Sequence, residues 1–167
     1  MSMDCTLYAA TPALVRQCAD TPEEFMARLA GRTPGAKSLA LRKAWHGLHF
    51  TLTGEAWEGK SPLSFLVCGG KEVAAEGDEE DEAYVPPRVL SPAFVRRLGK
   101  ALAVITPQAF AGRFDPVRLS EAGVYPRIWD EPPGDLLREY QGAFESVRRF
   151  VLACAERGDA IVVELTS

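Results

Sequence analysis

Two histidines placed three residues apart are the side chains of this sequence best suited to chemistry near neutral pH. His46 and His49 lie in the stretch KAWHGLHFTLTG and are the two histidines of the chain. Side chains three residues apart project from the same side of a helix, so both imidazoles are expected to face a common point. Such a pair could exchange protons with a substrate or help to bind a metal ion.

Three interpretations of this pair remain open. In an enzyme, a hydrolase or a transferase, His46 and His49 would act as catalytic groups together with Asp130 and Tyr125. In a metal site, the pair would need further ligands, and the candidates are Asp130, Glu131, Asp115 and Cys68. In the third interpretation both histidines make ordinary hydrogen bonds on a helix. Because the zinc-protease signature HExxH is absent, we favour the third interpretation and expect no metal and no cofactor.

A thiol in the stretch SFLVCGGKE is a second candidate. If this stretch forms a strand, Cys68 would lie at its end, beside the two glycines, where a nearby His46 or His49 could serve as its base. The alternative is a buried cysteine followed by a glycine turn, which we favour. The sequences GxSxG, GxxxxGK[ST] and GxGxxG are all missing, so the common hydrolase and nucleotide-binding folds lack their signatures.

The segment VYPRIWDEPPGD, residues 124–135, is a proline-rich connection with aromatic and acidic residues. We expect Trp129 to anchor it in the core and Asp130 or Asp135 to cap the helix that follows. An acidic role for Asp130 beside a histidine is the alternative. Loops of this composition also form protein-binding surfaces.

A Ser, Thr or Asp followed by proline predicts the start of each helix that positions these residues. The side chain of the first residue can cap the helix, and proline fits the first helical position. Thr21 with Glu24 additionally fits a capping box. A continuous apolar spacing predicts a long helix from Pro133 to Arg157, closed by Gly158. The five expected helix starts are Thr11-Pro12, Thr21-Pro22, Ser91-Pro92, Thr106-Pro107 and Asp115-Pro116.

The histidine stretch itself is expected to lie on a helix from Leu39 to Thr53, with Trp45, Leu48 and Leu52 facing the core. Strands are expected where β-branched or apolar residues gather between turns. These stretches are DCTLYAA near the N-terminus, SFLVCGG at Ser64 to Gly70, Arg88 to Leu90, and AIVVELT after Gly158. Strands separated by helices predict an α/β fold, a three-layer α/β/α sandwich around a small mixed sheet.

Length, charge and cysteine content narrow the class of protein. The 167 residues suit a single domain, 1–167, with a sizeable core. A net charge of -4 argues against nucleic acid and membrane surfaces as partners. Four dispersed cysteines and the absence of a signal peptide or a long apolar run predict a cytoplasmic protein. The acidic run from Glu76 to Tyr84 is expected to form a solvated loop.

Several stretches taken together resemble the YfbM-like family of small bacterial proteins of unknown function. They are KAWHGLHFTLTG, PLSFLVCGG, RVLSPAFV, the RFDP turn and YPRIWDE, and the resemblance extends from the N-terminus to the final strand. It implies a three-layer α/β sandwich and supplies no activity, cofactor or catalytic residue. The chain departs from the family pattern at Gly77 to Ala83, where an acidic insert replaces a shorter connection.

The leading functional hypothesis is a binding or regulatory module that contacts a protein partner through its surface. The rival hypothesis is the hydrolase or transferase with a site built from His46, His49 and Asp130. A third hypothesis is a structural dimer formed through the apolar stripe from Leu137 to Cys154. We expect a monomer or a weak homodimer.

Overall fold

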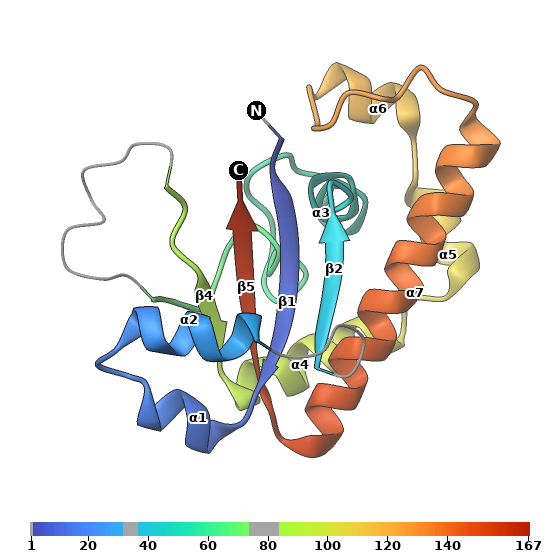
Figure 1. The fold of residues 1–167 in the computed structure, drawn as a ribbon. Helices are drawn as coiled ribbons and strands as arrows, with labels where there is room; N and C mark the ends of the chain where they lie inside the picture. The colour runs from blue at the N-terminus through green and yellow to red at the C-terminus, as the bar shows by residue number, and fades with distance from the viewer. Residues whose placement is uncertain (1, 32–36, 74–83) are drawn as a thin grey trace.

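A five-stranded antiparallel sheet lies at the centre of the molecule (Figure 1). The computed structural model describes residues 2–31, 37–73 and 84–167. In chain order its elements are β1 (Asp4–Ala10), α1 (Pro12–Gln17), α2 (Pro22–Ala30), β2 (Ser38–Arg42), α3 (Trp45–Thr53), β3 (Lys71–Glu72), β4 (Arg88–Leu90), α4 (Pro92–Ala103), α5 (Pro107–Arg113), α6 (Pro116–Glu121), α7 (Pro133–Arg157) and β5 (Ala160–Thr166).

The strand order is β2-β1-β5-β4-β3. Strands β1 and β5 pair along their whole length, from Asp4 opposite Thr166 to Ala10 opposite Ala160. The predicted α/β class is confirmed. Every pairing between the described strands is antiparallel, so the expected mixture of strand directions is not found there.

Helices cover both faces of the sheet, as a three-layer sandwich requires. The side chains of Leu7 and Ile161 point to one face, where they join the core under α3, α4, α5 and α7. Ala10 and Val162 point to the other face, where α1 and α2 pack. Figure 1 shows α1 and α2 in front of the sheet and α7 running beside β2. Because β5 is apolar on both sides, it can serve as the buried centre of both layers.

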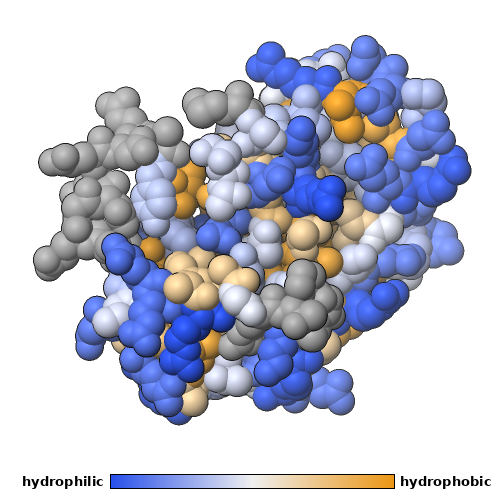
Figure 2. All heavy atoms as spheres, in the orientation of Figure 1, coloured by the Kyte–Doolittle hydropathy of each residue, from blue (hydrophilic) through white to orange (hydrophobic). Residues whose placement is uncertain are grey.

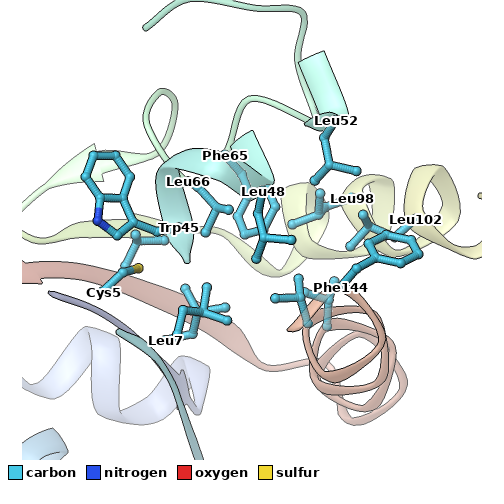
Figure 3. Close-up of a cluster of buried hydrophobic side chains, with 14 of the residues drawn as sticks. Cys5, Leu7, Trp45, Leu48, Leu52, Phe65, Leu66, Leu98, Leu102 and Phe144 are labelled. Atoms are coloured by element: carbon cyan, nitrogen blue, oxygen red, sulfur yellow. The ribbon is translucent and has the colours of Figure 1, made fainter. Parts of the chain in front are cut away.

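Helix α3 packs into the larger core by the face that its periodicity predicts. Trp45, Leu48 and Leu52 are buried there (Figure 3). The turn residues Phe65 and Leu66 close the same cluster and are fully buried. The apolar side of α3 is therefore occupied by core packing, and its histidines lie on the remaining side.

Four of the five predicted caps are confirmed. The side chains of Thr11, Ser91, Thr106 and Asp115 each accept a hydrogen bond from a backbone N–H in the first turn of their helix. Thr21 precedes its helix as expected but makes no such bond.

The capping box at Thr21 does not form, because the backbone N–H of Thr21 already donates to the carbonyl of Cys18 at 3.1 Å. The carboxylate of Glu24, which would accept from this N–H in a capping box, therefore finds the donor already occupied. The prediction failed because the preceding turn satisfied the same donor first.

The predicted strand from Ser64 to Gly70 is wrong. Residues 61–67 form consecutive turns, in which the N–H groups of Phe65, Val67 and Cys68 donate to nearby carbonyls of the same segment. The apolar run is buried as expected, but local turns satisfy its backbone instead of a neighbouring strand.

The predicted helix from Leu39 begins too early. Residues Ser38–Arg42 form the edge strand β2, and the helix starts at Trp45. Arg42 has a φ of 49°, and the N–H of Ala44 donates to the carbonyl of Leu41, so a turn separates strand and helix. Pairing with β1 outweighed the helical periodicity of this segment.

The long helix α7 has the predicted bounds and ends at Gly158, whose φ is 75°. Neither Asp130 nor Asp135 caps it. Its N-cap residue is Pro132, and Asp135 instead pairs with Arg138 at 2.9 Å.

The apolar stripe from Leu137 to Cys154, considered above as a dimer interface, packs against α4 and the sheet of the same chain.

Apart from Tyr84, the acidic run from Glu76 lies outside the described residues. No helix in the described part of the chain is long and apolar enough to cross a membrane.

Candidate functional site

His46 links two segments that are distant in sequence. Its Nδ1 atom accepts a hydrogen bond from the backbone N–H of Tyr125 at 3.1 Å. Its Nε2 atom lies 2.7 Å from the carbonyl oxygen of Ala56. Since a backbone N–H can only donate, Nδ1 is unprotonated, and the ring proton is on Nε2 and is donated to Ala56. The ring is thus held as one neutral tautomer.

The surroundings of His46 favour this neutral form. The side chain is 1% exposed, and burial lowers its pKa, while the carbonyl of Ala56 acts in the opposite direction. The ring stacks on Trp45 with centroids 4.8 Å apart. A substrate could reach neither nitrogen without breaking one of the two backbone hydrogen bonds.

His49 lies one turn further along α3 and has a different environment. It is fully buried, and neither ring nitrogen has a hydrogen-bond partner among the described residues. Burial lowers its pKa to about 4; the nearby backbone of Glu58, which lies outside hydrogen-bond geometry, opposes this shift. Electrostatic interactions with His46 and with the guanidinium of Arg88 lower the pKa further. His49 is therefore neutral near pH 7.

The segment that follows α3 presents a tryptophan to solvent. Trp57 is 60% exposed, although its ring lies 4.3 Å from the ring of His46 and 6.2 Å from that of Trp45. Its backbone is held from both sides: Ala56 accepts from His46, and the carbonyl of Trp57 accepts from the thiol of Cys68 at 3.3 Å. We refer to Trp57 with the exposed neighbours Glu55 and Glu58 as the Trp57 surface.

Tyr125 and the start of β1 complete the aromatic cluster. The Tyr125 hydroxyl accepts from the backbone N–H of Met3 at 3.1 Å, and the indole N–H of Trp45 donates to the carbonyl of Met3 at 3.1 Å. Tyr125, a candidate partner of the histidines in the enzyme hypothesis, contacts His46 through its backbone. Its hydroxyl contacts the backbone of Met3, and it is the backbone N–H of Tyr125 that meets His46.

The other candidate residues make no described contact with the imidazole of His46 or His49. Asp130 is exposed, and no described contact connects it with either imidazole. Trp129 is buried, as expected, and donates its indole N–H to the carbonyl of Val124. Cys68 is half-buried and bonded to Trp57 rather than to a histidine. Within the described ranges, no three His, Cys, Asp or Glu side chains are grouped to hold a metal ion.

The roles of two residues, Trp57 and Arg88, were not predicted from the sequence. Trp57 lies in the polar stretch EAWEGK, and a lone aromatic among charged residues is a signal of surface exposure. Arg88 is 8% exposed and donates to the carbonyls of Phe65, Leu66 and Gly69, which fixes the turns that contact the Trp57 segment. Nothing in the sequence around Arg88 indicates this role.

Comparison with known proteins agrees with this fold. The model of a family described as "Domain of unknown function (DUF1877)" matches residues 1–164. The crystal structure of YfbM, a protein of unknown function from Escherichia coli, is similar with a TM-score of 0.73 and 17% identity. The match covers 98% of this chain and 99% of that one. No curated protein matches the chain.

Proposed function

Because the chain belongs to the DUF1877 family, which carries no assigned activity, we propose a function from its described residues: it is a module that binds a protein partner through the Trp57 surface. The single observation that carries this proposal is the 60% exposure of Trp57. Tryptophan is among the residues most enriched at the energetic centres of protein interfaces, since it buries a large area when a partner covers it.

The fixed backbone around Trp57 supports the proposal. The hydrogen bonds from His46 to Ala56 and from Cys68 to Trp57 hold the segment on both sides of the indole. A side chain held in place before binding loses less conformational entropy when the complex forms. In this proposal the buried histidine serves binding indirectly, because it holds the loop that presents Trp57.

Charge indicates the chemistry of the partner. Glu55 and Glu58 are both exposed beside Trp57, and neither forms an ion pair with another described residue. An arginine or lysine of the partner could lie on the indole face and meet these carboxylates. We therefore expect a partner surface that carries basic side chains.

The enzyme hypothesis receives less support from the geometry. Both nitrogens of His46 are bonded to backbone groups, and both nitrogens of His49 are buried. A general acid or base must reach the substrate proton, directly or through one water.

The predicted cytoplasmic location remains part of our proposal, and the four cysteines, which are all free, fit a reducing compartment.

The proposal is tested by quantitative capture from a bacterial lysate with three immobilised proteins. Trp57→Ala removes the indole, Val117→Ala removes another exposed apolar side chain on α6 as a matched control, and both are compared with the unchanged chain. We expect a set of proteins retained by the unchanged chain and by Val117→Ala but lost from Trp57→Ala. A double Glu55→Lys, Glu58→Lys variant should lose the same set.

Identical capture by the unchanged chain and Trp57→Ala would overturn the proposal. So would a retained set that is indifferent to the charge reversal and to salt, because the carboxylates would then have no role in recognition. Light scattering of the unchanged chain at matched concentration shows whether the partner is a second copy of the same protein.

A further inference from the structure

A recess of about 520 Å³ lies between α1, α2 and the β3–β4 end of the sheet. It opens on the face of the sheet opposite α3, so it is separate from the Trp57 surface. Its lining includes Cys18, Phe25 and Ala160, which are each at most 3% exposed, and the partly buried Val89. Pockets of roughly 300–1,000 Å³ with mainly apolar walls are typical of small-molecule sites.

The face that carries α1 and α2 is turned toward the viewer in Figure 2, where apolar side chains are visible between hydrophilic ones. A recess with such a floor exposes apolar surface that water solvates poorly. Burying this surface under a ligand would be favourable in proportion to the apolar area removed from water.

Cationic side chains stand at the edges of this apolar floor. Arg16 on α1 and Lys71 on β3 both line the recess and are exposed, and neither forms an ion pair with a described residue. The guanidinium of Arg28 lies 3.5 Å from the sulfur of Cys18, which is part of the lining. Glu72 is the one carboxylate among the lining residues that the structure describes.

Among the described residues that line the recess, the balance of charge is opposite to that of the chain. The whole protein has a net charge of -4, yet two cations and one carboxylate are found among the described residues that line this opening. An anionic group would therefore be attracted here although the protein as a whole repels it. Lysine and arginine at the mouth of an apolar pocket are complementary to the carboxylate end of an amphipathic molecule.

We propose that this recess binds a small amphipathic carboxylate. Its apolar body, of roughly ten to twenty non-hydrogen atoms for a site of this size, rests on Phe25, Val89 and Ala160. Its carboxylate lies between Arg16 and Lys71. This site is independent of the protein-binding function proposed for Trp57.

The test uses decanoate and its neutral counterpart 1-decanol as probes, with binding followed by calorimetry on the full chain. The Arg16→Gln, Lys71→Gln double variant removes both cations without changing the apolar floor. Ala19→Trp places a large side chain at an exposed position of the lining and fills the recess. Trp57→Ala is the control for a site elsewhere.

Decanoate is expected to bind saturably to the unchanged chain and to Trp57→Ala alike. Binding should weaken at least tenfold in Ala19→Trp. In the double variant it should weaken about threefold to tenfold for decanoate and stay within twofold for 1-decanol, because exposed ion pairs contribute modestly. Circular dichroism verifies that each variant is folded.

Absence of saturable decanoate binding at millimolar concentration overturns the proposal. If decanoate and 1-decanol bind equally well, and the Arg16→Gln, Lys71→Gln double variant binds both as the unchanged chain does, the assignment of an anionic ligand is overturned. If Ala19→Trp fails to fold, the double variant still decides the outcome. Loss of decanoate binding in Trp57→Ala would show that the ligand occupies the other surface.

Discussion

The backbone N–H of Tyr125 donates to Nδ1 of His46 across 79 positions of the chain. The same imidazole donates from Nε2 to the carbonyl of Ala56, so one neutral ring joins the segment after α3 to the segment before α7. Each bond satisfies a backbone group in a partly buried position. His46 is therefore a structural link, and His49, three residues away, is not.

Replacing His46 with Leu should destabilise the protein. The change leaves the N–H of Tyr125 and the carbonyl of Ala56 without partners, at a cost of roughly 2–4 kcal/mol in the free energy of unfolding. Urea denaturation measures this loss. Trp57 should also become more mobile, which its fluorescence anisotropy would report. An unchanged midpoint would mean that solvent satisfies both groups.

Replacing His49 with Met should have the opposite effect near pH 7. Neither ring nitrogen of His49 has a described partner, so the apolar side chain removes buried polar atoms and makes nothing new unsatisfied. We expect a gain of up to about 1 kcal/mol in the free energy of unfolding. A loss larger than this in urea denaturation would show that the ring is bonded in solution.

The pKa of His49 predicts acid sensitivity. Its folded-state pKa of about 4 lies below the ordinary value of 6.5, so the unfolded chain binds a proton in this window that the folded chain excludes. The associated stability is complete above pH 6.5 and is lost as the pH falls toward 4, by on the order of 3 kcal/mol.

Unfolding free energies measured from pH 7 to pH 4 on the unchanged chain and on His49→Met test this. The variant should show a shallower decline over that window, because the carboxylates contribute equally to both. Parallel profiles would exclude His49 as the source of the decline.

Arg88→Lys should be destabilising although the charge is kept. Arg88 donates from Nη1 to the carbonyls of Phe65 and Gly69 and from Nη2 to that of Leu66, at 2.7–3.0 Å. One ammonium group cannot reproduce this fork, so we expect a loss of roughly 2–3 kcal/mol in thermal or urea unfolding. Arg96→Lys on the exposed side of α4 is the matched control and should change stability by less than about 0.5 kcal/mol.

Two helical glycines should respond in opposite directions to alanine. A Cβ atom at Gly47 would lie 2.5 Å from the ring of Tyr140 and 2.8 Å from that of Trp129, so Gly47→Ala should cost about 1–3 kcal/mol. At Gly142 in α7 no atom outside the helix's own neighbouring backbone lies within 4 Å of the added Cβ, and Gly142→Ala should gain about 0.5–1 kcal/mol. Melting temperatures that move in the same direction would contradict this packing.

Patterns set within a few residues could be predicted from the sequence. The caps at Thr11 and Ser91, the end of α7 at Gly158 and the strand β5 depend on one residue and its neighbours in the chain. The inward face of α3 followed from its apolar spacing. The sequence also placed Trp129 in the core, because an aromatic residue in a proline-rich loop needs an apolar surface to contact.

The tertiary structure decided which backbone groups each side chain satisfies. The carbonyls of Phe65, Leu66 and Gly69 in the turns that replace the predicted strand accept from the distant Arg88. The role of His46 depends on Ala56 and Tyr125. No local sequence pattern identifies these hydrogen-bond partners, and several of them are distant in the chain. Burial favours the neutral form of His46, whereas neither ring nitrogen of His49 has a hydrogen-bond partner among the described residues. Trp57 remains exposed. The fold class was therefore determined by local chemistry, and the use of the histidines was determined by long-range hydrogen bonds.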